Sequence, residues 1–266
     1  MKIIVCVKQV PDTSGKVAVN PDGTLDRASM QTITNPDDLN AVEAALKLKD
    51  ETGCKVIIVT MGPPPAEGML REILARGADE AVLVSGREFG GSDTYATSQI
   101  LAAAINRIGV EKEDIIMCGR QAIDGDTAQV GPQIAEKLHL PQVTYAADIQ
   151  KDGDTVLVKR MLEDGYMTVK VQTPCLLTCI KELNEPRYMS VGGIFDAYSK
   201  PMSVFDYEAL KDDPLIDPTT IGLKGSPTNI LTSFTPPQKG AGMMLEGADK
   251  ETCEKLAGIL AKKHII

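Results

Sequence analysis

The sequence has no tryptophan, and aromatic residues make up only 4% of its 266 positions. Histidine is equally scarce: His139 and His264 are the only two, which disfavours a zinc site or a His-based catalytic triad. No apolar run reaches the length of a transmembrane span, and the five-residue run near the N-terminus is too short for a signal peptide. We therefore expect a cytoplasmic protein without membrane insertion, a metal site or acid–base catalytic residues.

Positive charge is also in short supply. The chain has 28 Lys and Arg residues against 37 Asp and Glu residues, a net charge of −9, which makes it a poor candidate for binding nucleic acid or an anionic membrane. Cysteines occur, but without a Cys-x-x-Cys motif and mostly within apolar runs, which predicts free buried thiols in a reducing compartment. They are Cys6, Cys54, Cys118, Cys175, Cys179 and Cys253.

Over the first 140 residues, short apolar runs alternate with helical patterns. The runs that predict buried strands are residues 2–7, 56–59, 81–84 and 115–118. The segments expected to be helical are residues 36–53, 69–77, 93–109 and 127–138, the third of them capped by Ser92. Asp22-Gly23 predicts a hairpin. The β-α repetition predicts a parallel sheet with helices on both faces.

From residue 141 the pattern becomes one of short strands joined by turns, so antiparallel additions to the sheet are expected. These strands are residues 142–148, 155–161, 167–171 and 175–180. Beyond Asn184 the chain is rich in Pro, Gly and Asp until a final helix at about residues 250–262. Such a tail cannot bury much of itself, so we expect it to pack on another subunit. The predicted organisation is an α/β domain over residues 1–190 and an extended C-terminal arm over residues 191–266.

Ligands of parallel sheets bind beyond the carboxyl ends of the strands, where helices begin. That rule selects residues 6–11, 35–38, 61–65, 90–94 and 119–129. In the last of these, small residues let the backbone approach a ligand, and the following helix offers N–H groups to a phosphate. Thr127 could cap the helix or contact a phosphate, and Asp124 and Asp126 could bind ribose or adenine or simply form the turn. Neither G-x-G-x-x-G nor a Walker A motif is present.

Several separated motifs resemble one family. Residues 119–126 read GRQAIDGD and residues 183–188 read LNEPRY. With VCVKQV at residues 5–10 and Asn35-Pro36, they resemble the electron transfer flavoprotein β subunit, in the same order along nearly the whole chain to Pro236-Pro237-Gln238. The resemblance implies a Rossmann-like parallel sheet of the adenine nucleotide α-hydrolase type. It also implies pairing with an α subunit that carries FAD in a mobile domain.

The resemblance further implies adenine-nucleotide contacts at the strand ends. For Cys6 and Met61 the alternative is core packing, because backbone contacts need no particular side chain. The implied residues are Cys6, Gln9, Asn35, Pro36, Asp37, Asp38, Met61, Gly62, Gly119, Arg120, Gln121, Ala122, Ile123, Asp124, Gly125, Asp126, Thr127, Ala128, Gln129 and Val130.

Two branches of this family differ in the cofactor of the β subunit: one holds a structural AMP, and the electron-bifurcating one holds a second FAD that accepts hydride from NADH. GGSDTYAT at residues 90–97 and RMLEDGYM at residues 160–167 resemble the bifurcating branch. A glycine pair before a helix leaves room for a flavin and a nicotinamide, and Thr94 and Thr97 share one helical face. A capped surface helix and an ordinary polar hairpin are the alternatives. The implied flavin-site residues are Gly90, Asp93, Thr94 and Thr97.

The resemblance therefore implies a subunit that splits hydride electrons from NADH. One electron would go to ferredoxin or flavodoxin, and the other through the α-subunit FAD to a dehydrogenase such as an acyl-CoA dehydrogenase. Oxidation of NADH would need the whole α/β complex. The alternatives are a non-bifurcating carrier with AMP and a nucleotide-binding regulatory module without a redox role. The family's dehydrogenase-docking loop corresponds to residues 187–195, with partner contacts implied for Tyr188, Met189, Val191 and Ile194.

Overall fold

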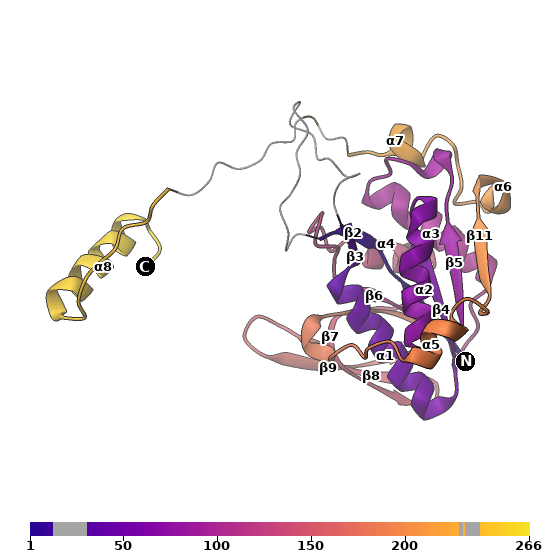
Figure 1. Ribbon diagram of the computed structural model, residues 1–266, viewed down its shortest axis with the longest axis horizontal. Helices are drawn as coiled ribbons and strands as arrows, with labels where there is room; N and C mark the ends of the chain where they lie inside the picture. Colours follow the sequence, from indigo (N-terminus) through magenta and orange to yellow (C-terminus); the bar gives the residue numbers. More distant parts are fainter. Residues whose placement is uncertain (13–30, 229–230, 232–239) are drawn as a thin grey trace.

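A nine-stranded sheet with strand order β11-β5-β4-β1-β6-β10-β7-β8-β9 forms the centre of the molecule (Figure 1). The computed structural model describes residues 1–12, 31–228, 231 and 240–266. The hairpin expected around Asp22-Gly23 and the Pro236-Pro237-Gln238 motif lie outside these described residues.

The strands from β11 to β7 in this order are mutually parallel, which confirms the predicted parallel sheet. They are β11 (Met202–Phe205), β5 (Glu80–Val84), β4 (Lys55–Met61), β1 (Lys2–Cys6), β6 (Ile115–Gly119), β10 (Cys175–Cys179) and β7 (Gln142–Asp152). The antiparallel strands β8 (Thr155–Met161) and β9 (Tyr166–Gln172) extend the sheet beyond β7. A separate antiparallel pair consists of β2 (Gln9–Pro11) and β3 (Thr32–Thr34).

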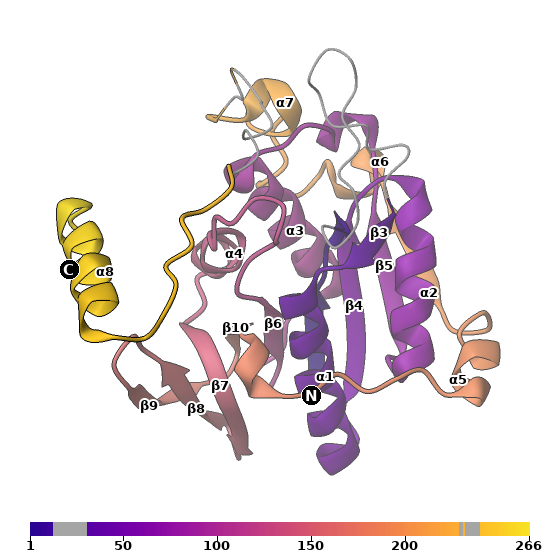
Figure 2. The same ribbon diagram turned by 60° about the vertical axis from the view of Figure 1, so that its left-hand side comes forward.

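Helices cover both faces of the sheet (Figure 2). Alternate residues of β1 divide between two cores: Ile3 and Val5 pack with α1 and α2, and Ile4 and Cys6 pack with α3 and α4. The helices are α1 (Pro36–Thr52), α2 (Glu67–Arg76), α3 (Thr94–Ile108), α4 (Val130–Lys137), α5 (Val191–Asp196), α6 (Tyr207–Leu210), α7 (Gly222–Gly225) and α8 (Lys250–Lys262). Single 3-10 turns occur at η1 (Pro64–Ala66), η2 (Arg87–Phe89) and η3 (Lys181–Leu183). No helix in the described part of the chain is long and apolar enough to cross a bilayer.

Helix α1 shows how local sequence sets these elements. Pro36 and the acidic pair Asp37 and Asp38 occupy its first turn, where a missing N–H and negative charge are both favourable. The helix ends where Gly53 takes the left-handed conformation (φ 70°) and donates its N–H to Lys49 O at 2.8 Å. The predicted boundaries of this helix are confirmed.

Three local expectations are wrong. Helix α3 is capped by Asp93, whose side chain accepts the Ala96 N–H, because the Ser92 hydroxyl is bonded to Phe89 O and the Gly222 N–H instead. Helix α4 begins at Val130 rather than residue 127, after a loop with left-handed residues. Strand β10 is not an antiparallel addition, because it is inserted parallel between β6 and β7.

The sequence predicts that residues beyond 190 pack mainly on another subunit. This prediction is wrong for residues 191–226, which pack on the α/β domain. Helix α5 packs on α2, and β11 adds a parallel edge strand beside β5. The expectation overlooked β11 because its four residues become a strand only by pairing with β5. The final helix α8 has the predicted bounds and lies apart from the sheet in both views (Figures 1 and 2), with none of its residues buried.

The packing of α5 on α2 yields a first prediction. A Cβ at Gly193 would collide with the Ala75 carbonyl oxygen, whereas a Cβ at the neighbouring Gly192 meets no described atom within 4 Å. Gly193→Ala should therefore lower the free energy of unfolding by roughly 1–3 kcal/mol, a usual cost of overpacking. Gly192→Ala, the matched control, should be neutral or slightly stabilising, and equal urea midpoints for the two variants would contradict this packing.

Candidate functional site

Segments far apart in the sequence meet at the carboxyl edge of the parallel sheet. The fully buried Asn35 joins the start of α1 to the loop after β6: its Nδ2 donates to Gln121 O at 2.8 Å, and its Oδ1 accepts the Ile123 N–H at 3.1 Å. Both polar atoms of this amide are thus engaged within the chain. Asn35 therefore holds the loop in place by bonding the Gln121 carbonyl and the Ile123 N–H.

Asp38 is the second link at this edge and is only 6% exposed. Its Oδ2 accepts the Lys8 N–H and its Oδ1 accepts the Gly119 N–H, both at 2.8 Å, so it joins α1 to the ends of β1 and β6. Burial raises the pKa of this carboxyl to about 7, although the two N–H bonds act to lower it. Gly119 is needed here because a Cβ would lie 2.6 Å from the Asp38 nitrogen.

Charged side chains fix the first half of the loop. The Lys8 ammonium pairs with the Asp124 carboxylate at 2.7 Å, and Gln121 Nε2 donates to Asp126 Oδ1 at 2.6 Å. The Arg120 guanidinium lies 3.4 Å from Asp37 Oδ2. Burial raises the pKa of Asp37, and the charge of Arg120 opposes that rise. The carboxylates of Asp124 and Asp126 therefore have bonding partners within the chain.

The second half of the loop contains a left-handed residue followed by a right-handed one. Asp126 (φ 49°) and Ala128 (φ 53°) are left-handed, and Gln129 is right-handed (φ −106°, ψ −32°). Such a pair is typical of the backbone nests that bind anions. The N–H groups of Thr127, Ala128 and Gln129 have no acceptor among the described residues. Thr127 does not cap α4, which has no side-chain cap within the described part of the chain. The free N–H groups and the start of α4 suit a phosphate.

Helix α3 begins beside this loop, because Thr94 Oγ1 donates to Gln129 Oε1 at 3.0 Å. Thr97 lies one turn further, and its N–H donates to Asp93 O at 2.9 Å. Before the helix, Gly90 O accepts the Leu223 N–H at 2.9 Å. The structure thus brings the 90–97 segment to the same edge as the 119–130 loop, as predicted from the strand-end rule.

Cys6 and Met61 contribute their side chains to the core on the α3 side of the sheet. Burial raises the pKa of the Cys6 thiol to about 12, which keeps it protonated and unreactive. Gln9 bonds Thr32 across the β2–β3 pair, and the Gly62 N–H donates to Val84 O. These four residues hold the edge in place through packing and main-chain structure, while Pro36 is exposed beside them.

Two further residues contribute to this edge. Lys8 lies in the 6–11 segment that the strand-end rule selected, but it was not among the predicted site residues. Its position directly after a predicted strand was the available indication of a role. Tyr145 takes a left-handed conformation (φ 58°) at an irregularity of β7, and its ring lies under the Arg120 guanidinium, 6.0 Å from ring centroid to carbon. Nothing in the local sequence indicates that conformation, because it arises from the shifted pairing of β7 with its neighbours.

The predicted docking residues lie at the other end of the molecule, where α5 sits beside the C-terminal end of α2 (Figure 2). Arg187 anchors this region by pairing with the buried Glu43 at 2.9 Å and with Asp50 at 2.8 Å. The apolar side chains of the region are exposed, with Val191 at 75% and Tyr188 at 93%. We call them the α5 patch, which consists of Tyr188, Met189, Val191, Ile194, Phe195 and Tyr198.

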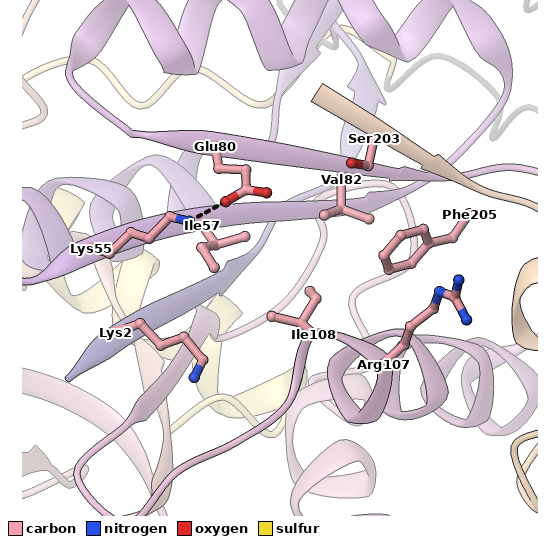
Figure 3. A pocket seen from close by; sticks show the side chains of 9 residues that line it. All are labelled: Lys2, Lys55, Ile57, Glu80, Val82, Arg107, Ile108, Ser203 and Phe205. Carbon is pink, nitrogen blue, oxygen red and sulfur yellow. Dashed lines mark ion pairs between the residues drawn. The ribbon is translucent and has the colours of Figure 1, made fainter. Parts of the chain in front are cut away.

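A hollow of about 340 Å³ opens at the amino-terminal edge of the sheet (Figure 3). Its cations already have partners within the chain: Lys55 pairs with Glu80, Lys2 pairs with Asp114, and Arg107 lies over the Phe205 ring. The hollow shares no residue with the carboxyl-edge site.

The chain belongs to the electron transfer flavoprotein family, since residues 22–210 match the electron transfer flavoprotein domain. It is 71% identical over 267 residues to the acryloyl-CoA reductase electron transfer subunit gamma of Anaerotignum propionicum, covering 100% of both chains. It is 54% identical over 269 residues to the caffeyl-CoA reductase-Etf complex subunit CarD of Acetobacterium woodii, again over 100% of both chains. The electron transfer flavoprotein subunit beta of Clostridium acetobutylicum is 51% identical over 267 residues, with the same full coverage. These relatives confirm the resemblance to the β subunit.

The raised pKa of Asp38 predicts a pH-dependent stability. A carboxyl with a pKa of about 7 in the fold and ~4 when unfolded binds its proton more tightly in the fold. Its contribution to the free energy of unfolding therefore falls as pH rises from ~4 to ~7. The loss is about 1.4 kcal/mol per pH unit, which amounts to a few kcal/mol over this range. The facing groups are Asp37, Cys6, Cys118 and Cys179, and the thiols stay neutral over this range because their pKa values are also raised.

Urea unfolding between pH 5 and 8 should show this loss in the natural chain and a flatter profile in Asp38→Asn. Asp206→Asn makes the same chemical change at an exposed helix cap and should keep the natural slope. An unchanged slope in Asp38→Asn would show that Asp38 is not the titrating group.

Proposed function

We propose that this chain is the β subunit of a heterodimeric electron transfer flavoprotein and holds FAD at the carboxyl edge of its sheet. The observation that carries the proposal is the cradle of free N–H groups at Thr127, Ala128 and Gln129, beside the start of α3. Family membership supplies the flavoprotein class.

The residues present suit an adenine dinucleotide. The free N–H groups and the first turn of α4 offer donors to a pyrophosphate. Gly125 leaves room, because no described atom lies within 4 Å of a Cβ built there. The charge of Asp124 is compensated by the Lys8 ammonium, and the Asp126 carboxylate is held by Gln121 Nε2.

When bound, FAD would supply the redox chemistry: uptake of hydride from NADH, then transfer of one electron to ferredoxin or flavodoxin and of the other through the α-subunit FAD to a dehydrogenase. The chain would bind and orient the cofactor. Thr94 and Thr97 are three residues apart at the start of α3, so both hydroxyls can face one ligand. Two relatives are named as subunits of acryloyl-CoA and caffeyl-CoA reductases, which supports a CoA-ester oxidoreductase as the final partner.

The C-terminal arm supports pairing with an α subunit. Helix α8 carries Leu256, Ile259 and Leu260 on a helix without a buried residue. An amphipathic helix gains its stability by burying such a stripe, so it needs an apolar surface from another chain. We propose that residues 240–266 pack on the α subunit.

The purified α/β complex should hold about two flavins per heterodimer by visible absorption, since each subunit would hold one. One flavin with AMP would favour the non-bifurcating carrier, and no flavin would favour the regulatory module. Gly125→Val and Asp124→Ala should each weaken FAD binding to this subunit about tenfold or more, ~1.4 kcal/mol. The first places a side chain in the ligand's space, and the second frees the loop from Lys8.

Gly68→Val is the matched control, because Gly68 lies in α2 outside the predicted site residues and is equally open among the described residues. It should leave flavin occupancy unchanged. Full occupancy in a folded Gly125→Val variant would remove the 119–130 loop from the site.

The exposure of the α5 patch leads to a separate prediction about docking of the dehydrogenase. An exposed apolar anchor that enters a partner pocket often dominates a transient interface. Val191→Asp should slow electron transfer to the dehydrogenase about tenfold, and Val191→Ala less so. Stopped-flow reduction of the flavin by NADH should proceed at the natural rate, because the patch lies at the other end of the fold.

Val204→Ala serves as the control, since Val204 is also exposed (61%) but lies on β11 outside the patch. If transfer and reduction fall together, Val191 supports the subunit structure. If neither changes, the patch is not the docking contact.

A further inference from the structure

The two carboxylate oxygens of Asp93 serve different parts of the chain. Oδ1 accepts the Ala96 N–H at 3.0 Å and caps α3, whereas Oδ2 accepts the Thr228 N–H at 2.9 Å. Thr228 follows α7 and lies within the C-terminal arm. One side chain therefore holds both the start of α3 and the arm at Thr228.

Residues 222–228 are fastened to the 90–93 loop by further bonds. The Asp93 N–H donates to Ser226 Oγ at 2.8 Å, and the Gly222 N–H donates to Ser92 Oγ at 3.1 Å. A Cβ at the left-handed Gly91 would lie 2.8 Å from the Leu223 Cβ, so the two backbones approach closely. Of these contacts, the Thr228 bond lies furthest along the arm.

The residue after Asp93 continues the connection. The Thr94 hydroxyl donates to Gln129 Oε1 at 3.0 Å, at the end of the 119–130 loop. Gln129 is one of the residues with a free N–H in the proposed phosphate cradle. Two adjacent residues, Asp93 and Thr94, thus connect the arm, α3 and the loop.

We infer that Asp93 is a positioning residue that couples the C-terminal arm to the nucleotide site, through Thr228 on one side and Thr94 and Gln129 on the other. This inference rests on the proposed function for the identity of the ligand. It assigns Asp93 a role different from the cofactor contact that the sequence suggested, because both of its oxygens are used within the chain. Arm placement and retention of FAD should then depend on one another.

The substitution Asp93→Asn separates the two bonds. Asparagine caps helices as well as aspartate, so its oxygen keeps the Ala96 bond, but its NH₂ group cannot accept the Thr228 N–H. Hydrogen–deuterium exchange of the α/β complex should show residues 222–228 exchanging roughly 10- to 100-fold faster. This is the change expected when a hydrogen bond to a charged group is lost. The first-turn amides of α3 should keep their natural exchange, and FAD should leave this subunit faster.

Asp206→Asn is the matched control: Asp206 caps α6 by accepting the Ala209 N–H, and its variant should leave residues 222–228 unchanged. Asp93→Ser, another good cap with a single oxygen, provides a second test should the first variant fail to fold. Unchanged exchange of residues 222–228 in Asp93→Asn would overturn the inference. Equal acceleration in α3 would also overturn it, because Asp93 would then be a helix cap alone.

The test separates this inference from the proposed function. If the natural complex holds no FAD in this subunit, the proposed function fails, while the exchange comparison still decides whether Asp93 fastens residues 222–228. If FAD is present and the variant releases it at the natural rate despite faster exchange, the coupling is overturned and the proposed function stands.

Discussion

The buried Asp38 carboxylate is the interaction on which the carboxyl edge depends. It holds the start of α1 against the ends of β1 and β6 by accepting one N–H from each strand end. The cost of burying this group is visible in its raised pKa and is partly offset by the two bonds. Because Gly119 lacks a side chain, α1 comes close enough for Asn35 to reach the loop beyond β6.

The same helix extends to the opposite end of the fold. Helix α1 has 17 residues and therefore spans about 25 Å. Asp38 in its first turn fixes the carboxyl edge, whereas Glu43 and Asp50 hold Arg187, which directly precedes the α5 patch. The ion pair between Arg187 and the buried Glu43 resists breaking, because loss of one partner would leave an uncompensated buried charge. One rigid element thus holds both the carboxyl edge of the sheet and the α5 patch.

Local patterns predicted much of this fold. Strand β8 and helix α8 have the expected bounds, and the rule for strand ends correctly placed the loop after β6 at the carboxyl edge of the sheet. What escaped prediction depends on pairing at a distance. Strand β10 enters between β6 and β7, and β11 exists only beside β5. The contacts of Asn35 with Gln121 and Ile123 and the bond from Thr228 to Asp93 Oδ2 have the same origin, since these partners lie 86 to 135 residues apart in the sequence. Spacing along the chain does not encode such contacts.

The loop after β6 takes left-handed conformations without a glycine-rich fingerprint. Such fingerprints use glycine because it adopts left-handed conformations without penalty. Here Asp126 and Ala128 take those conformations, which aspartate tolerates and alanine adopts at a cost of about 1 kcal/mol. The loop is held against this cost by bonds on both sides: Asn35, Lys8 and Gln121 fix its first half, and Thr94 holds Gln129 at its end. The donor array is therefore maintained by long-range contacts, and a glycine motif is not needed to form it.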